Sequence, residues 1–283
     1  MIIKTKQDNT TDLAWERLYI RLEQDNLLPR KEISFKRILF KSTGFRWAAS
    51  IAILCVCLLT VLFLKQTTNT SKSELLVLQN ETNAPTLVTT LEDGSVVYLS
   101  AQAIIYYPAH FQEDKRAVTL TGNAFFEISK QQERPFVIDT EVAEIEVLGT
   151  FFEVQSSDKS SFHLSVRNGE VKVTLKHTRQ TIHVQAGETA SLASGSLQLS
   201  KTGIHQFNNY FEKLCFKDER LADIVRIIND NANQIPIEVA AEQENRRLNF
   251  DYSGETSQEI AHLICLALNL HYSQQQNKII ITQ

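Results

Sequence analysis

Histidines and paired acidic residues are the side chains of this sequence that could carry out acid–base or metal chemistry. His163 and His183 alternate with apolar residues, and so do Glu144 and Glu146, which predicts that all four lie on solvent-facing sides of strands. The sequence contains no H-E-x-x-H, C-x-x-C, G-x-S-x-G or G-x-x-x-x-G-K-[ST] motif. We therefore expect no enzymatic activity, no metal site and no cofactor.

The four cysteines fall into two pairs. Cys55 and Cys57 lie inside a long apolar run, where we interpret them as lipid-facing residues. Cys215 and Cys265 lie in the part that is predicted below to be exported, where a disulfide is chemically feasible. Both fall outside the core-facing stripes of their predicted elements, so we expect free thiols, and a disulfide between them remains the alternative.

The apolar run extends from Trp47 to Leu64 and contains no charge, no Gly and no Pro. As a helix its eighteen residues span about 27 Å, close to the thickness of about 30 Å of a bilayer's hydrocarbon core. A buried helix of a soluble protein is rarely so long without a charge, and a cleaved signal peptide would lie nearer the N-terminus. We therefore predict a single transmembrane helix at 47–64.

The basic residues predict the orientation of this helix. Only Lys65 and Lys72 closely follow the helix. Six basic residues closely precede it, namely Arg30, Lys31, Lys36, Arg37, Lys41 and Arg46. The positive-inside rule then places residues 1–46 in the cytoplasm and exports everything beyond the helix. We expect an inner-membrane protein with a periplasmic C-terminus. The slight excess of acidic residues over the whole chain does not suggest nucleic-acid binding.

The cytoplasmic segment is predicted to form a short helix at residues 10–24. Trp15, Leu18, Tyr19 and Leu22 share one face of it at spacings of three and four residues. A helix of this length is marginally stable alone in water, so its apolar stripe needs a partner. Lipid is the less favoured partner because acidic and basic residues alternate beside the stripe.

Residues 65–85 are predicted to be a periplasmic tether, and residues 86–202 an all-β domain with a period of two. Asn168-Gly169 predicts a tight hairpin turn that places Val166 opposite Val171. All six apolar residues of this hairpin would share one buried face: Phe162, Leu164, Val166, Val171, Val173 and Leu175. Asp93-Gly94 predicts a second turn of the same kind.

Residues 207–283 are predicted to form a small α+β domain, with the element order β-α-β-β-α-β-β and two helices on one sheet. Asp218 is expected to cap the first helix, and Thr256 with Glu259 to form a capping box for the second. The first helix should bury Leu221, Ile224, Val225 and Ile228, and the second Ile260, Leu263, Ile264, Ala267 and Leu268. The last strand, 278–282, is expected to close a hairpin.

Several short sequence motifs of the β domain resemble those of a known family. They are LEDGSVVYLS (91–100), VTLTGNAFFEISK (118–130), ERPFVI (133–138), VLGTFFEV (147–154), VRNGEVKV (166–173) and AGE (186–188). In this order and spacing they resemble the FecR family of membrane-bound sigma-factor regulators. The last 75 residues are similar to the C-terminal domain of FecR-like proteins of the Bacteroidetes type, itself related to the short N-terminal domain of secretins and TonB-dependent transducers.

The resemblance implies a function and partners. It implies a transmembrane anti-sigma factor that relays a signal from a TonB-dependent outer-membrane transducer to a cytoplasmic extracytoplasmic-function sigma factor, with proteases of the envelope as further partners. By this analogy the apolar stripe of residues 15–22 contacts the sigma factor. The transducer would pair with an exposed sheet edge, for which we expect Lys278, Ile279, Ile280, Ile281 and Thr282, and deletion of 207–283 should leave a stable protein. The alternative is a membrane-anchored periplasmic scaffold without a transcriptional role.

Overall fold

The computed structural model describes residues 8–25, 56, 58, 60, 74–158, 161–201, 207 and 210–283. The chain divides into two units, Met1–Thr70 and Ser71–Gln283. In the predicted membrane segment 47–64 only Val56, Leu58 and Thr60 are described, and all three are helical. The rest of that segment lies outside the described residues. Among the residues that are described, none of the helices is both long and apolar enough to cross a membrane.

The first unit contains the helix that the sequence predicts near the N-terminus. Helix α1 extends over Asp8–Gln24. The side chains of Trp15, Leu18 and Tyr19 are exposed, with exposed fractions of 69%, 47% and 61%. Leu13 and Ile20 are also about half exposed. At about 100° per residue they lie on the face of the helix opposite to Trp15, Leu18 and Tyr19. The helix therefore displays apolar side chains on two faces.

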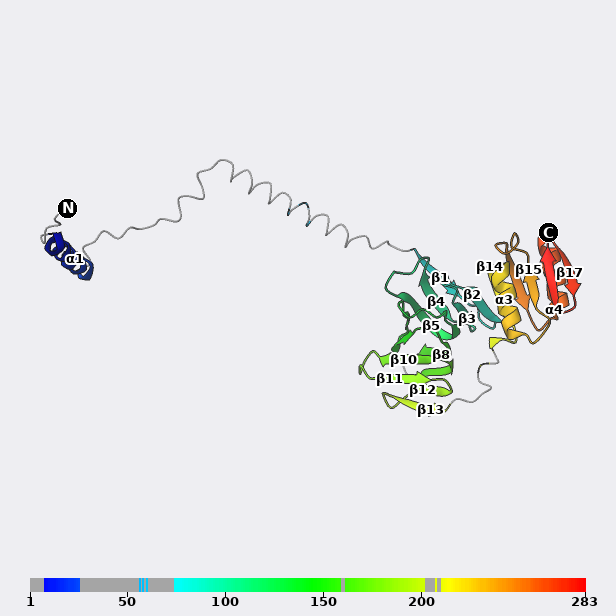
Figure 1. The fold of residues 1–283 in the computed structure, drawn as a ribbon. Coiled ribbons are helices and arrows are strands. Elements are labelled where there is room, and N and C mark those ends of the chain that lie inside the picture. The colour runs from blue at the N-terminus through cyan, green and yellow to red at the C-terminus, as the bar shows by residue number, and fades with distance from the viewer. Residues whose placement is uncertain are drawn as a thin grey trace. The chain divides into compact units, whose positions relative to one another are not determined.

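The described residues of the second unit form eighteen strands and two helices. Figure 1 shows their arrangement. The strands up to the end of the β domain are β1 (Leu75–Gln79), β2 (Thr86–Thr90), β3 (Val96–Leu99), β4 (Ile104–Pro108), β5 (Arg116–Glu127), β6 (Phe136–Asp139), β7 (Ala143–Val147), β8 (Phe151–Asp158), β9 (Ser161–Asn168), β10 (Glu170–Leu175), β11 (Thr181–Gln185), β12 (Glu188–Ala193) and β13 (Ser196–Lys201). The elements that follow are β14 (Leu214–Arg220), α3 (Leu221–Asn231), β15 (Ile237–Val239), β16 (Arg247–Tyr252), α4 (Ser257–Leu268), β17 (His271–Gln275) and β18 (Lys278–Thr282).

Strand β5 joins two layers of sheet because each of its halves pairs with different neighbours. Its first half pairs with β4 and β6, and its second half with β3 and β8. Gly122, between the halves, has a φ of +96°, and a Cβ there would lie 2.9 Å from the Cα of Ala103. Only glycine fits this bend without strain. One core packs between the layers, with side chains from β4, β6, β7 and β10 on one side and β3, β8 and β9 on the other.

A second core lies on the other side of β2, β3 and β5, where the C-terminal elements cover the sheet. All four residues of β3 are buried: Val97 and Leu99 face the first core, and Val96 and Tyr98 face the second. Strand β14 pairs in parallel with β2, so the sheet continues into the C-terminal region. Figure 1 shows β14 and α3 beside β2 and β3. Strand β14 of the C-terminal region therefore extends the sheet of the β domain, and residues of both regions build the second core.

The predicted element order β-α-β-β-α-β-β of the C-terminal region is confirmed. The expectation of a single sheet there is wrong, because β14 and β16 pair in the large sheet while β15, β18 and β17 form a separate three-stranded sheet. The predicted capping box is present: the Thr256 side chain accepts the Glu259 backbone N–H, and the Glu259 carboxylate accepts that of Thr256.

The predicted hairpin at Asn168-Gly169 is wrong. Strand β9 pairs with β8 and β12, whereas β10 pairs with β7 and β11, so Val166 does not face Val171 across a ladder. The chain crosses from one layer to the other here, and Gly169 takes a φ of +92°. The predicted faces are nevertheless right, because all six apolar residues of β9 and β10 are buried in the first core.

Three further expectations differ from the structure. Asp218 does not cap α3, because Arg220 occupies the N-cap position and Asp218 sits in an irregularity of β14 with a φ of +50°. In α4, Leu263 and Ala267 are exposed, and Ala261 and Cys265 are buried in their place. Strand β1 forms within the expected tether because its residues 75–79 pair with β4.

Candidate functional site

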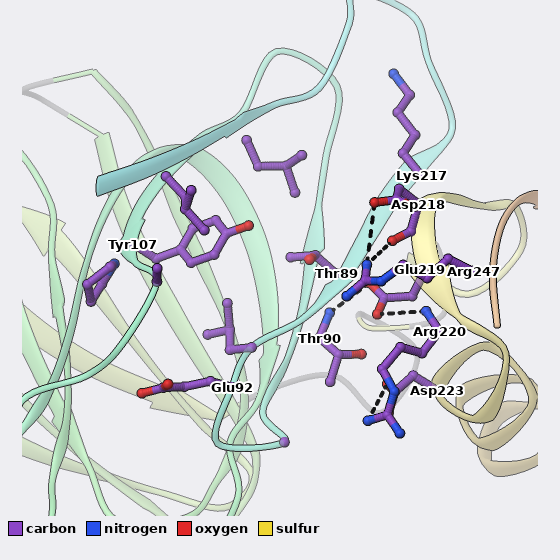
Figure 2. Close-up of a pocket in the computed structure, with 16 residues that line it drawn as sticks. Thr89, Thr90, Glu92, Tyr107, Lys217, Asp218, Glu219, Arg220, Asp223 and Arg247 are labelled. Carbon is purple, nitrogen blue, oxygen red and sulfur yellow. Dashed lines mark hydrogen bonds and ion pairs between the residues drawn. The ribbon is translucent and has the colours of Figure 1, made fainter. Parts of the chain in front are cut away.

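A cavity of about 490 Å³ lies between strands β1 and β4 of the β domain and strand β14, which extends the other layer of sheet into the C-terminal region. Its walls are the strands β1 and β4 on one side and β14, the start of α3 and β16 on the other, and the end of β2 lies between them. Figure 2 shows Tyr107 on the first side and Lys217, Asp218, Glu219 and Arg247 on the second.

Glu219 is the most buried charged side chain that lines this cavity, with an exposed fraction of 6%. One carboxylate oxygen accepts the backbone N–H of Thr90 at 3.1 Å, and the other that of Arg220 at 3.3 Å. Burial raises the pKa of this carboxyl group, while those two N–H groups partly oppose the shift. The irregularity of β14 between Phe216 and Glu219 positions the side chain here.

Two other polar atoms in the cavity wall are buried and have no hydrogen-bond partner among the described residues. They are the hydroxyl Oγ1 of Thr90 and the guanidinium Nε of Arg220; both residues line the cavity, but these two atoms have almost no accessible surface. Across the cavity, burial raises the pKa of the Tyr107 hydroxyl, the Thr89 side chain lowers it, and the negative charge of Glu219 raises it further. The main chemical feature of the cavity is thus the desolvated carboxyl group of Glu219.

A buried ion pair holds together three of the sequence motifs that carry the family resemblance, those at 91–100, 118–130 and 133–138. Nη1 of Arg116 lies 2.7 Å from Oδ2 of Asp93 and also donates to the carbonyl of Ser129 at 2.9 Å. Its Nε donates to the carbonyl of Arg134 at 2.9 Å. At Gly149 a Cβ would lie 2.6 Å from the Cα of Lys130, so only glycine permits this approach. We conclude that these sequence motifs have mainly structural roles.

The residues predicted to contact a sigma factor lie together on α1. Trp15, Leu18 and Tyr19 are exposed and Leu22 is half-buried, so the stripe is available in the described part of the chain. Its contact with a partner remains a prediction.

The residues predicted to pair with a transducer lie on β18, which is the middle strand of its sheet. It pairs with β15 on one side and β17 on the other, and Ile279 and Ile281 are buried. The expectation that Lys278, Ile279, Ile280, Ile281 and Thr282 form an open edge is therefore wrong. The strand was expected at an edge because it closes a hairpin, but the parallel pairing with β15 is not visible in a local pattern. The outer strands of this sheet are β15 and β17.

Within the described residues, no group of three or more His, Cys, Asp or Glu side chains is placed to hold a metal ion. Cys215 and Cys265 are free thiols, as expected. Burial, together with the nearby Asp251, raises the pKa of Cys215 to about 11. This thiol is therefore protonated near neutral pH and a poor nucleophile.

Sequence reasoning did not find the cavity. Four of its polar residues lie in the stretch Lys217–Arg220, directly after LCF (214–216), and we predicted a helix cap rather than a strand there. The available signal is the alternation of Leu214 and Phe216, which predicts a strand. Glu219 lies after the irregular step of this strand and departs from the period of two, and a local pattern does not show which strand lies opposite.

Comparison with known proteins identifies the class of the β domain. Residues 81–172 match the family model of FecR, "FecR protein". The resemblance predicted from the sequence is thus confirmed over this range, and the chain contains a FecR domain.

Two crystal structures, at 2.50 and 1.65 Å, of a "putative anti-sigma factor" from Parabacteroides distasonis ATCC 8503 are also similar to this chain. Each is 20% identical and covers 74% of this chain and 99% of its own, with TM-scores of 0.46 and 0.45. No curated protein matches the chain.

Proposed function

We propose that this protein is a single-pass inner-membrane regulator that binds an extracytoplasmic-function sigma factor with its cytoplasmic segment. The FecR match over residues 81–172 is the observation that carries the proposal. The uncharged segment Trp47–Leu64 and its basic N-terminal flank support a single crossing with the FecR domain outside. The exposed stripe of α1 offers the cytoplasmic contact, since large aromatic side chains dominate interface energetics.

Purification of the intact protein from membranes tests this proposal. We expect a sigma factor to co-purify, and a variant that lacks residues 8–25 to lose it. A reporter that is active only in the periplasm should work when it is fused after Lys201 and fail when it is fused after Asp25. Envelope proteins without a sigma factor in the purified material would instead favour the periplasmic scaffold.

The signal is proposed to enter from the periplasmic domain of a TonB-dependent transducer through the three-stranded sheet. Its strand β17 pairs only with β18 among the described residues and is largely exposed, so one edge is open for strand addition. A photo-crosslinking residue at Gln274 of β17 should capture the transducer in cells that receive inducer. The same residue at Gln198 of β13, also exposed, serves as control. Equal capture from both positions would contradict contact through β17.

A further inference from the structure

Strand β1 ends one layer of sheet with an edge that has no neighbour among the described residues. It pairs antiparallel with β4 from Leu75 to Gln79, without a bulge, and with no other strand that the structure describes (Figure 1). The backbone groups of successive residues in an antiparallel strand point to opposite sides. The carbonyl of Glu74 and the N–H of Asn80 bond to residues that flank β4. Leu75, Val77 and Gln79 therefore direct their N–H and C=O groups to the open side.

The side chains of β1 are apolar on both faces. Leu75 and Val77 lie on the outer face, with exposed fractions of 62% and 57%, and Leu76 and Leu78 lie on the face toward the cavity. On β4, Tyr106 pairs with Val77 and continues the outer face. A continuous apolar run is typical of strands that are covered on both faces. The composition of β1 therefore fits a strand inside a larger sheet better than a strand at its edge.

The absence of charge distinguishes β1 from the other open edges of the described structure. Five further strands have one neighbour there, and each contains a charged residue or a histidine. Strand β1 contains no charge, no histidine and no proline, which are common devices against pairing of edges. Like charges that face each other across two strands are unfavourable, so an uncharged strand is suited to pair with its own copy. The residues in the other five strands are His183 of β11, Lys201 of β13, Glu238 of β15, Arg247 of β16 and His271 of β17.

The length of chain before β1 limits which partners can reach it. Nine residues, 65–73, separate Leu64, the end of the predicted membrane helix, from Glu74. At no more than about 3.6 Å per residue, β1 stays within about 36 Å of the end of that helix. This limit rests on the single membrane crossing proposed above. The candidates within this distance are the lipid surface and other chains that are anchored in the same membrane.

Lipid would cover the side chains of β1 but would not satisfy its backbone. N–H and C=O groups without partners are costly in hydrocarbon, which is why open sheet edges do not occur there. A further strand covers the side chains and also satisfies the backbone. Every copy of this chain carries the same uncharged strand at the same distance from its own membrane helix, and anchoring in one membrane raises the effective concentration of the copies. A second copy is therefore the partner that fits best.

We propose that β1 pairs antiparallel with β1 of a second copy, around a two-fold axis at Val77. Val77 then pairs with the second copy's Val77 and Leu75 with its Gln79, so the open backbone groups bond to one another. On the cavity side, Leu76 lies opposite the second copy's Leu78. A register shifted by two residues would place one of the open residues opposite a residue outside β1. With the axis along the membrane normal, both chains lead back to the same membrane. The proposed function contains no self-association, so the inference goes beyond it.

Disulfide formation in native membranes tests the register. The four native cysteines are replaced by Ala, and an oxidant is added. Val77→Cys should crosslink with itself, because opposite residues of a hydrogen-bonded pair have Cα atoms about 5.5 Å apart, within the range of a disulfide. Gln79→Cys, exposed on the same face, is the matched control and should not crosslink with itself. Co-expressed Leu75→Cys and Gln79→Cys copies should crosslink. Absence of the Val77→Cys dimer, or an equal dimer from Gln79→Cys alone, overturns the register.

Charge substitution tests the pairing in chains that keep their native cysteines. Two copies with different affinity tags are co-expressed, and their co-purification in mild detergent is measured. Val77→Lys in both copies, or Val77→Glu in both, should lower it about five-fold or more, because like charges then face each other. One copy of each variant should restore it. Leu199→Lys on β13, where the side chain is 49% exposed, is the control and should leave it unchanged. Unaltered copies that do not co-purify overturn the dimer, and a mixed pair as weak as the like-charged pairs overturns the contact at Val77.

Neither measurement involves a sigma factor, so this inference and the proposed function can fail separately. Loss of the sigma factor from the purified protein, together with an intact Val77→Cys crosslink, would reject the proposed function alone. A bound sigma factor with a monomeric chain in both measurements would reject the dimer alone. Labelling of such a monomeric chain at β1 by a photoactivatable lipid would assign the edge to the membrane surface instead.

Discussion

Arg116 and Asp93 form an ion pair that is almost completely excluded from water, with side-chain exposed fractions of 0% and 2% and a distance of 2.7 Å from Nη1 to Oδ2. Asp93 also accepts hydrogen bonds from the backbone N–H and the hydroxyl of Ser95, so the pair stabilises the turn between β2 and β3. The guanidinium additionally stacks over the ring of Phe136, 5.4 Å from its centroid.

Arg116→Met should lower the free energy of unfolding by about 3–5 kcal/mol, because it leaves the Asp93 carboxylate buried without a cation. Chemical denaturation of the full chain in detergent, followed by circular dichroism of the β structure, measures this. Lys176→Met breaks the solvent-exposed pair with Asp139, in which both side chains are more than one third exposed, and should cost about 1 kcal/mol or less. Equal losses for the two variants would show that burial of the pair does not matter.

Val171→Asp should destabilise the FecR domain by several kcal/mol, because Val171 is fully buried in the first core and the new carboxylate would have no partner. Its neighbour Lys172 is about half exposed and pairs with Glu146. Lys172→Gln should therefore change stability by about 1 kcal/mol or less in the same denaturation measurement.

The strands β9 and β10 show how much of the fold the sequence could predict. Alternation correctly identifies the buried faces of Phe162–Val166 and Val171–Leu175, because a period of two depends only on the local backbone. Pairing partners are not local, since β9 pairs with β12 and β10 with β7. Asn168-Gly169 is favourable for a tight hairpin, but packing two layers around one core sends the chain across instead.

The same limit applies to the C-terminal region and the cavity. Its element order was predictable because helices have capping residues and apolar stripes, as at Thr256 and Leu221. Its attachment to β2 depends on a parallel pairing over more than 120 residues, between Thr86 and Leu214. The cavity with Glu219 exists only because of this attachment. The apolar stripe of α1, by contrast, was predictable because it depends only on spacing along one helix, but the exposed Leu13 and Ile20 on the opposite face were not part of that prediction.

Removal of residues 207–283 should destabilise the FecR domain, contrary to the expectation from sequence of a stable remainder. The deletion uncovers Val88, Val96, Tyr98 and Phe125, all buried against the second core. Burial of a Val or Phe side chain contributes about 1.5–3 kcal/mol each. The truncated protein should bind a dye specific for exposed apolar surface and be degraded faster in cells. A truncated protein with unchanged abundance and no dye binding would argue against a shared core.

Glu127 should make the stability of the protein depend on pH. Burial raises the pKa of this carboxyl group and Asp230 raises it further, while Arg226 and the Tyr98 hydroxyl lower it. The folded state therefore holds its proton to higher pH than the unfolded state. The resulting stability is fully present below the ordinary pKa of 4.5 and is lost as the pH rises through the raised value. Melting temperatures between about pH 4 and 7 should fall less steeply for Glu127→Gln than for the unaltered protein, and parallel curves would refute this.

The last prediction concerns the two apolar faces of α1. Trp15→Ala with Tyr19→Ala removes the large aromatic side chains from the predicted contact, and we expect loss of sigma-factor binding. If the protein represses when idle, transcription of the target genes should rise without inducer. If it assists its sigma factor, induction should be abolished. Leu13→Ala with Ile20→Ala alters the opposite face of the same helix, where the side chains are 54% and 51% exposed. This control should retain normal signalling at an unchanged protein level. Loss of signalling in the control alone would place the sigma-factor contact on that other face.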